Sequence, residues 1–328
     1  MTRNRYFLAA AAVLAATTTT GSAFAHQAPS HRVIARVPLN ALADGIAFDG
    51  SSLWIKTTGN GKLVQIDPTR AKIKARYPVG TPTPGWPSFG APDEWVATDD
   101  GTVWVTDQPS NRVLGVDRLT GKVTTQVRVT TPWDVASGFG SLWVPLFDVD
   151  ELDRVADDGT IVKQIPIPNP TAVAIGAGSV WVVAHRVGKV MRIDPTTNRV
   201  IKTIKLPDEG GWTGGGAERA AFGANALWTS TDGGVTRVDA RTNAVRHIKM
   251  PSQGCCTYWV TTGGGAAWVA TPNNVYRVDG KTLRVTKALV IRHHNCSLVA
   301  KKPCIGALAF ADGHLWVEDN GARQLVRW

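Results

Sequence analysis

The stretch Pro170–Pro207 reads PTAVAIGAGSVWVVAHRVGKVMRIDPTTNRVIKTIKLP, and it decides the fold. Four short runs rich in Val and Ile (AVAIG, VWVV, KVMRI and VIKTIKL) are separated by the turn sequences GAGS, HRVG and DPTTN. Runs of strand length bounded by Gly, Pro, Asn and Asp predict an antiparallel meander of four strands. One sheet of this kind cannot bury its own faces, so it needs further copies beside it.

The rest of the chain supplies these copies. A pair made of Leu, Val or Ala followed by Trp recurs seven times, at Trp54, Trp104, Trp143, Trp181, Trp228, Trp268 and Trp316. Intervals of 38 to 50 residues, with four strands in each unit, are typical of a β-propeller. We therefore predict an all-β, seven-bladed β-propeller of four-stranded antiparallel blades, with the Trp side chains packed between neighbouring blades.

Two further patterns support this fold. Most units carry an apolar residue and then Asp, 11 to 13 residues after the Trp, at Asp67, Asp117, Asp194, Asp239 and Asp279. We expect these side chains to accept backbone N–H bonds in the turn between the third and fourth strands. The last unit has three strands and ends at Trp328, whereas residues 33–39 (VIARVPL) resemble the fourth strand at 200–206. The N-terminal strand is thus predicted to complete the last blade and remove the open edges of the ring.

The first 25 residues are not expected to belong to the propeller. Arg3 and Arg5 precede the apolar run 7–16, and Ala23-Phe24-Ala25 is typical of a cleavage site. These features predict a secretory signal peptide at 1–25, a single propeller domain at 26–328, and a secreted or periplasmic protein. No later stretch is apolar enough to span a membrane. The net charge of +10 falls to +8 without the signal peptide, and its basic residues are scattered, which does not favour nucleic-acid binding.

The repeat units also resemble those of known families. VWVVAHRVGKVMRIDPTTNRVIKTIKLP and VWVTDQPSNRVLGVDRLTGKVTTQVRV look like the YVTN-type repeats of secreted bacterial propellers. They also look like the repeats of streptogramin (virginiamycin B) lyases, a seven-bladed family. The resemblance covers essentially the whole mature chain. It implies the fold, but proteins with and without enzymatic activity share this repeat pattern.

Long loops indicate where a binding site lies. Residues 81–93, 208–217 and 292–304 each precede an innermost strand, and residues 145–153 join a second strand to a third. In propellers these two kinds of connection open on one face. Insertions gathered on one face favour binding there.

Aligned positions predict which side chains surround the channel mouth. One ring, counted back from each Trp, comprises Asp44, Glu94, Trp133, Thr171, Glu218, Tyr258 and Gly306. A second ring, three residues after each Trp, comprises Thr57, Asp107, Leu146, Ala184, Thr231, Thr271 and Asp319. Asp44, Glu94 and Glu218 suit a hard cation such as calcium or magnesium, while Trp133 and Tyr258 suit a sugar or another flat ligand. The alternative is that the ring only hydrogen-bonds water.

The resemblance to streptogramin lyases implies catalytic His and Glu at the channel mouth, with magnesium. The corresponding steps here are Pro132-Trp133-Asp134-Val135 and Pro170-Thr171-Ala172-Val173, and no copy has His at that place. General acid–base catalysis needs a titratable group within reach of its proton. His185, His293, His294 and His314 lie elsewhere. His185 is the one unusual residue of the otherwise plain fourth unit, and we retain it as a candidate.

Four cysteines in an exported chain predict disulfides. Cys255 and Cys256 are adjacent, and Cys296 and Cys304 flank a short loop. Three connectivities are possible, of which we favour Cys296–Cys304 with a Cys255–Cys256 bridge because the short spacing makes closure easy. Their spacing matches no zinc site.

Three functions remain after these observations. We predict an exported binding propeller without catalysis, a monomer that holds a small molecule, a glycan or an envelope protein on its loop-rich face. The second possibility is a metal-assisted lyase or hydrolase that uses Glu94 or Glu218 with a divalent cation in the central channel. The third is an interaction scaffold with an inert channel.

Overall fold

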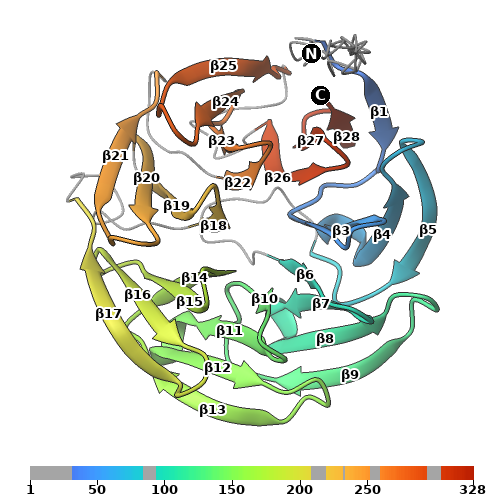
Figure 1. Cartoon of the computed structure of the whole chain (residues 1–328). Helices are drawn as coiled ribbons and strands as arrows, with labels where there is room; N and C mark the ends of the chain where they lie inside the picture. Colours follow the sequence, from blue (N-terminus) through green and yellow to red (C-terminus); the bar gives the residue numbers. More distant parts are fainter. Residues whose placement is uncertain (1–31, 84–93, 208–218, 232, 252–258, 294–303) are drawn as a thin grey trace, which may run out of the picture. The chain divides into compact units, whose positions relative to one another are not determined.

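A computed structural model describes residues 32–83, 94–207, 219–231, 233–251, 259–293 and 304–328. These residues belong to a compact unit, His31–Trp328. Seven four-stranded antiparallel sheets form a ring in this unit, as Figure 1 shows. The predicted all-β, seven-bladed propeller is therefore confirmed.

The first four blades follow the chain in order. Blade 1 comprises β2 (Gly45–Phe48), β3 (Leu53–Thr57), β4 (Lys62–Asp67) and β5 (Lys72–Pro78). Blade 2 comprises β6 (Val96–Thr98), β7 (Thr102–Asp107), β8 (Arg112–Asp117) and β9 (Val123–Arg128). Blade 3 comprises β10 (Ala136–Ser137), β11 (Leu142–Leu146), β12 (Glu151–Val155) and β13 (Ile161–Pro166). Blade 4 comprises β14 (Pro170–Gly176), β15 (Ser179–Ala184), β16 (Lys189–Asp194) and β17 (Arg199–Lys205).

The last three blades include the closure of the ring. Blade 5 comprises β18 (Ala220–Gly223), β19 (Ala226–Thr231), β20 (Gly234–Asp239) and β21 (Val245–Lys249). Blade 6 comprises β22 (Trp259–Gly263), β23 (Ala266–Ala270), β24 (Asn274–Asp279) and β25 (Val285–Val290). Blade 7 comprises β26 (Ile305–Ala311), β27 (His314–Asp319), β28 (Gln324–Arg327) and, as its fourth strand, β1 (Ala35–Pro38).

The predicted closure by the N-terminal strand is observed. β1 pairs antiparallel with β28, with Val37 opposite Leu325. Val37 and Leu39 are buried against the blade. Beyond the strand, the Asn320 side chain receives a hydrogen bond from the Ala43 amide (3.1 Å) and donates one to the Ala43 carbonyl (3.2 Å). The two ends of the ring are thus held by a strand ladder and by a side-chain bridge.

The core of the propeller is divided among the blade junctions. Each repeat Trp is buried and belongs to an apolar cluster with a neighbouring blade. Trp54 packs with Val103 and Val105 of blade 2, and Trp316 packs with Leu53 and Ile55 of blade 1. Because every blade contributes its Trp to such a junction, burial of these rings stabilises the stacking of the sheets.

The Asp residues after the third strands accept backbone bonds, as predicted. Asp239 Oδ1 accepts from the amides of Arg241 (3.1 Å) and Thr242 (2.9 Å). Asp67, Asp117, Asp194 and Asp279 make the same kind of bond. Hydrogen bonds to the charged form lower the pKa of each of these carboxyls. The Asp residues therefore shape the turns.

Helical structure in the described residues is limited to three 3-10 turns, η1 (Thr58–Asn60), η2 (Gln108–Ser110) and η3 (Phe147–Val149). Each of them joins the second strand of a blade to the third. In this part of the chain we find no helix with the length and hydropathy required of a membrane span.

The closing strand gives a first prediction. Leu39→Ala should lower the free energy of unfolding by about 2–5 kcal/mol, because it leaves a cavity at a fully buried position. The matched change Arg36→Ala, at an exposed position of β1 three residues earlier, should have little effect. Denaturant unfolding measures both. Removal of residues 33–39 should likewise lower the melting temperature more than removal of residues 26–31, and equal melting temperatures would contradict the closure.

Candidate functional site

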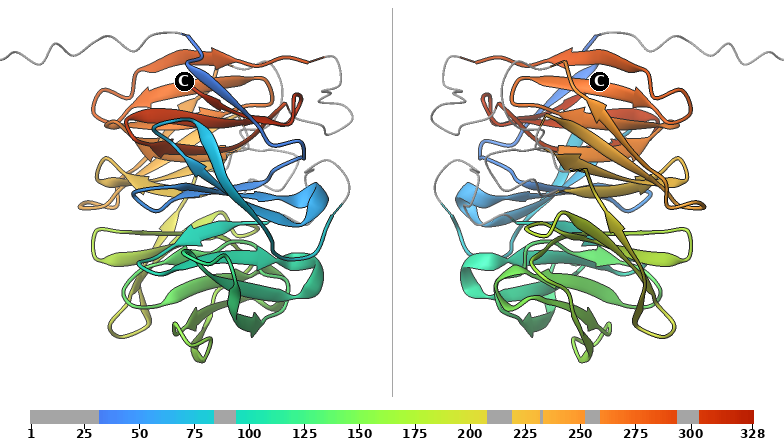
Figure 2. Two further views of the ribbon diagram at one scale, coloured as in Figure 1. Left: turned by 90° about the vertical axis from the view of Figure 1, so that its right-hand side faces the viewer. Right: turned by 90° about the vertical axis from the view of Figure 1, so that its left-hand side faces the viewer.

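Two kinds of connection meet on one face of the ring. These are the segments that lead into the innermost strands and the connections between second and third strands; we call this side the loop face and the opposite side the turn face. In the left-hand view of Figure 2, the 3-10 turns of blades 1 and 2 project on the right and mark the loop face. All of the predicted site residues that the structure describes lie at these two kinds of connection or in the strand ends beside them.

Glu94 forms an internal ion pair. Its two carboxylate oxygens each lie 2.8 Å from Nζ of Lys56, and both side chains are fully buried. Lys56 comes from β3 of blade 1, whereas Glu94 leads into β6 of blade 2. The Glu94 amide also donates to Asp44 Oδ2 at 3.2 Å. Asp44 and Glu94, two of the predicted ring residues, therefore join blades 1 and 2.

Asp107 lies beside this pair and has cationic and amide partners of its own. Its Oδ2 accepts from Nε of Arg112 at 2.6 Å, and its Oδ1 accepts from the Thr81 amide at 3.1 Å. Burial raises the pKa of Glu94 to about 7; the Lys56 charge opposes this rise and the Asp107 charge adds to it. Glu94 is thus a carboxyl that titrates near neutral pH inside a blade junction.

Three side chains meet across the centre of the ring, and we call them the central stack. Cζ of Arg219 lies 4.8 Å from the Trp95 ring centroid and 4.9 Å from the Trp259 ring centroid. The two ring centroids are themselves 4.9 Å apart, so the guanidinium packs beside the indole pair and contacts both rings. Trp95 enters blade 2, Arg219 enters blade 5 and Trp259 begins blade 6. Blade 2 neighbours neither blade 5 nor blade 6 in the ring, so these contacts span the central axis.

The stack is buried and polar at the same time. Arg219 and Trp259 are buried, and among the described residues Nε1 of Trp95 has no hydrogen-bond partner. A desolvated guanidinium over an indole face is worth about 2 kcal/mol. The central stack therefore ties blade 2 to blades 5 and 6 across the ring.

An aromatic cluster forms at blades 3 and 4. Trp133, a predicted ring residue, packs against Phe147 of η3 with a centroid distance of 4.6 Å and an interplanar angle of 31°. The Phe147 ring also faces His185 at 6.5 Å and the guanidinium of Arg186 at 4.8 Å. Trp133 is half-buried, His185 and Phe147 are buried and Arg186 is exposed. We call Trp133, Phe147, His185 and Arg186 the aromatic patch.

The carboxyls of blade 7 are also engaged. Asp319 Oδ1 lies 2.9 Å from Nε2 of His293, and Oδ2 accepts from Nε2 of Gln324 at 2.8 Å. The adjacent Glu318 is fully buried, and its Oε2 accepts from the Ala307 amide at 2.9 Å. Its Oε1 has no partner within the described part of the chain. Burial raises the pKa of Glu318 to about 8.

Several predicted residues lie outside the described residues. They are Glu218, Tyr258, Cys255, Cys256 and Cys296. The disulfide pairing therefore stays a prediction, although Cys304 itself is buried at the start of blade 7. In the residues that the structure describes, no group of three or more His, Cys, Asp or Glu side chains could hold a metal ion.

Sequence reasoning missed the central stack by one residue. Trp95, Arg219 and Trp259 each directly follow a predicted ring residue, namely Glu94, Glu218 and Tyr258. It also missed the positions two residues after each Trp, which include Lys56 and Glu318. A Lys and a Glu at equivalent positions of strands rich in apolar residues were the available signal. Phe147 was included only as part of the loop 145–153.

Comparison with solved structures shows what the fold is similar to. A streptogramin B lyase structure matches with a TM-score of 0.72 and 16% identity, over 89% of this chain and 96% of that one. Hydrazine synthase of Kuenenia stuttgartiensis matches with a TM-score of 0.66 and 12% identity over the same shares. BamB from Moraxella catarrhalis matches with a TM-score of 0.55 and 14% identity, over 87% of this chain and 83% of that one. No known family and no curated protein matches the sequence. The likeness is one of fold.

The buried Glu318 gives a second prediction. From about pH 4.5 to 8 its carboxyl binds more protons in the folded than in the unfolded state, so the free energy of unfolding falls as the pH rises. Glu318→Gln removes this charge and keeps an oxygen for the Ala307 amide. At pH 8 the variant should be more stable than the parent by on the order of 2–4 kcal/mol, with almost no difference at pH 4.

Urea unfolding at the two pH values measures this effect. Asp148→Asn, at an exposed position, is the control and should leave the pH dependence unchanged. A stability difference for Glu318→Gln that is the same at both pH values would contradict the assignment.

Proposed function

We propose that the protein is an exported, non-catalytic binding propeller that holds a ligand with a flat face, such as a glycan or an aromatic small molecule, on the aromatic patch of its loop face. One observation carries the proposal: the half-buried Trp133 packs against Phe147, and the exposed Arg186 lies over the Phe147 ring. A partly exposed indole ring next to a cation is suited to stacking on a flat ligand.

The surroundings of the aromatic patch support binding. Val149 and Val187, from the same two connections, expose 45% and 39% of their surface. An apolar surface with a polar rim favours ligand contact. The carboxylates Asp44, Glu94, Asp107 and Asp319, in contrast, already have partners within the protein. A role for them as the ligands of a divalent cation needs these bonds to break, so we place recognition at the aromatic patch.

Export is the second part of this proposal. It is supported by the charged and apolar pattern of residues 1–25 and by the Ala23-Phe24-Ala25 step. A small ligand, a glycan and a protein of the cell envelope are all available to a secreted or periplasmic protein.

A thermal-shift screen with oligosaccharides and flat aromatic compounds tests the proposal. A ligand present at 100 times its Kd should stabilise the folded state by about 2.7 kcal/mol. Trp133→Ala should weaken that ligand by about five- to tenfold in calorimetry, because a stacking surface is lost. Phe139→Ala is the matched control, since Phe139 is exposed in a turn between first and second strands on the turn face. The absence of any ligand, or equal losses in both variants, would contradict the proposal.

The alternative is a metal-assisted lyase or hydrolase. It is favoured by the pKa of Glu94, which burial raises to about 7, because a base that titrates near neutral pH suits proton transfer. Incubation with a streptogramin B and magnesium, followed by mass spectrometry, distinguishes the two functions. The binding proposal predicts no cleavage above that of the Glu94→Gln variant. Magnesium-dependent cleavage that Glu94→Gln abolishes would establish the lyase instead.

A further inference from the structure

On the turn face, two arginines make the same set of contacts in successive blades. In blades 3 and 4, an Arg of the third strand stacks on the repeat Trp of its own blade, Arg154 over Trp143 at 5.0 Å and Arg192 over Trp181 at 4.7 Å. Nε of each Arg donates to a serine hydroxyl at 2.8 Å, on Ser141 or Ser179. We call this arrangement the arginine clasp.

The clasp also reaches the next blade. Arg154 donates to the Pro195 carbonyl (2.7 Å) and to the side-chain oxygen of Asn198 (2.9 Å) in the turn of blade 4. Arg192 donates in the same way to Ala240 (2.9 Å) and Asn243 (3.4 Å) of blade 5. At two successive junctions, therefore, a serine, a carbonyl and an asparagine occupy the guanidinium.

The junction between blades 5 and 6 lacks the clasp. Ala226 stands where Ser141 and Ser179 stand, two residues before the Trp, and Leu283 stands where Asn198 and Asn243 stand. Arg237, the equivalent arginine, lies 5.9 Å from its Trp and bonds instead to its own Asp239 at 3.1 Å. The Arg237 side chain is 16% exposed. Its Nε is buried and has no hydrogen-bond partner among the described residues.

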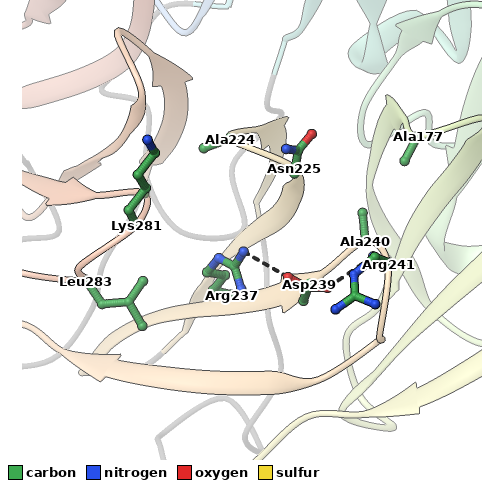
Figure 3. A pocket seen from close by; sticks show the side chains of 10 residues that line it. Ala177, Ala224, Asn225, Arg237, Asp239, Ala240, Arg241, Lys281 and Leu283 are labelled. Carbon is green, nitrogen blue, oxygen red and sulfur yellow. Dashed lines mark hydrogen bonds and ion pairs between the residues drawn. The ribbon is translucent and has the colours of Figure 1, made fainter.

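A pocket opens at this junction. It has a volume of about 700 Å³ and is lined by the turns of blades 4, 5 and 6. Arg237, Arg241 and Lys281 line it together with Asp239; Figure 3 shows Asp239 between the two arginines. The lining therefore holds three cationic side chains and one anionic side chain. The Asp239 carboxylate already accepts hydrogen bonds from Arg237 and from the Thr242 amide and hydroxyl. The volume is typical of a small-molecule site.

We propose that this pocket binds a small organic anion through a carboxylate or phosphate group held by Arg237 and Arg241, with Lys281 as a further positive charge. A guanidinium with free N–H groups binds such oxygens in a forked, charge-assisted manner. The ligand replaces the serine and asparagine that occupy the arginine in blades 3 and 4. The site lies on the turn face and is independent of the aromatic patch.

Restoring the clasp is the sharpest test. Ala226→Ser with Leu283→Asn gives Arg237 the partners that Arg154 and Arg192 have. Position 283 has a left-handed φ of 60°, as do Asn198 (57°) and Asn243 (59°), and Asn tolerates this conformation better than Leu. Asn at position 283 gives up the partial packing of Leu283 on the apolar cluster of blades 5 and 6, and the relief of the left-handed φ offsets this loss. The double variant should therefore fold, which circular dichroism checks, and should lose the anion site.

Calorimetric titration with citrate and with inorganic phosphate, at constant ionic strength, measures binding. The parent should bind at least one of the two saturably, and the stronger probe shows whether carboxylate or phosphate is preferred. Arg237→Ala and the clasp-restoring double variant should each weaken binding by about ten- to hundredfold, the effect of losing a charge-assisted bond. Arg241→Ala should weaken anion binding as well. Because Arg241 is exposed, this change should leave folding unaffected.

Lys163→Ala on blade 3, also exposed, is the matched control and should leave binding unchanged. Saturable binding by the parent that is lost in the arginine variants and retained in Lys163→Ala supports the site. The site would be overturned if the parent bound neither probe at millimolar concentration, or if the clasp-restoring variant bound as well as the parent.

Discussion

The pairing of β1 with β28 is the constraint on which the rest of the structure depends. Without it, blade 7 lacks its outer strand and the ring has an open edge between blades 7 and 1. Closure brings the starts of all the innermost strands around one axis. Only in a closed ring do Trp95, Arg219 and Trp259 meet from blades that are not neighbours. The central stack is thus a consequence of closure and reinforces it.

Repetition explains what could be predicted from the sequence. The repeat Trp recurs every 38 to 50 residues, and in most units an Asp follows it after 11 to 13 residues, so local patterns are enough to place both. The three-stranded last unit and the strand-like residues 33–39 indicate the closure. The candidate site follows no such rule. The partner of Glu94 is Lys56, 38 residues earlier, and the residue that crosses the axis is Trp95, one position further on. Side chains alternate between the two faces along a strand. In the segment just before a strand this alternation does not decide which of two adjacent residues faces the axis.

The carboxylates of the predicted ring serve the structure, whereas an aromatic residue of that ring remains accessible. Asp44 and Asp134 each accept an amide from the next blade, Glu94 at 3.2 Å and Val173 at 2.9 Å, and so contribute to the cohesion of the ring. The aromatic residues divide between the axis and the surface: Trp95 and Trp259 contact each other and Arg219, whereas Trp133 stays half-buried against Phe147. This distribution favours ligand recognition at the aromatic patch, away from the centre of the ring that the central stack occupies.

Fluorine NMR of the protein labelled with 5-fluorotryptophan tests this view most directly, with resonances assigned by single Trp→Phe variants. Addition of a ligand found by screening should shift the Trp133 resonance, because its ring lies in the aromatic patch. The resonances of Trp95 and Trp259 should stay in place, because their rings remain stacked on Arg219. A ligand that shifts Trp95 and Trp259 and leaves Trp133 unchanged would contradict the account and place binding at the centre of the ring.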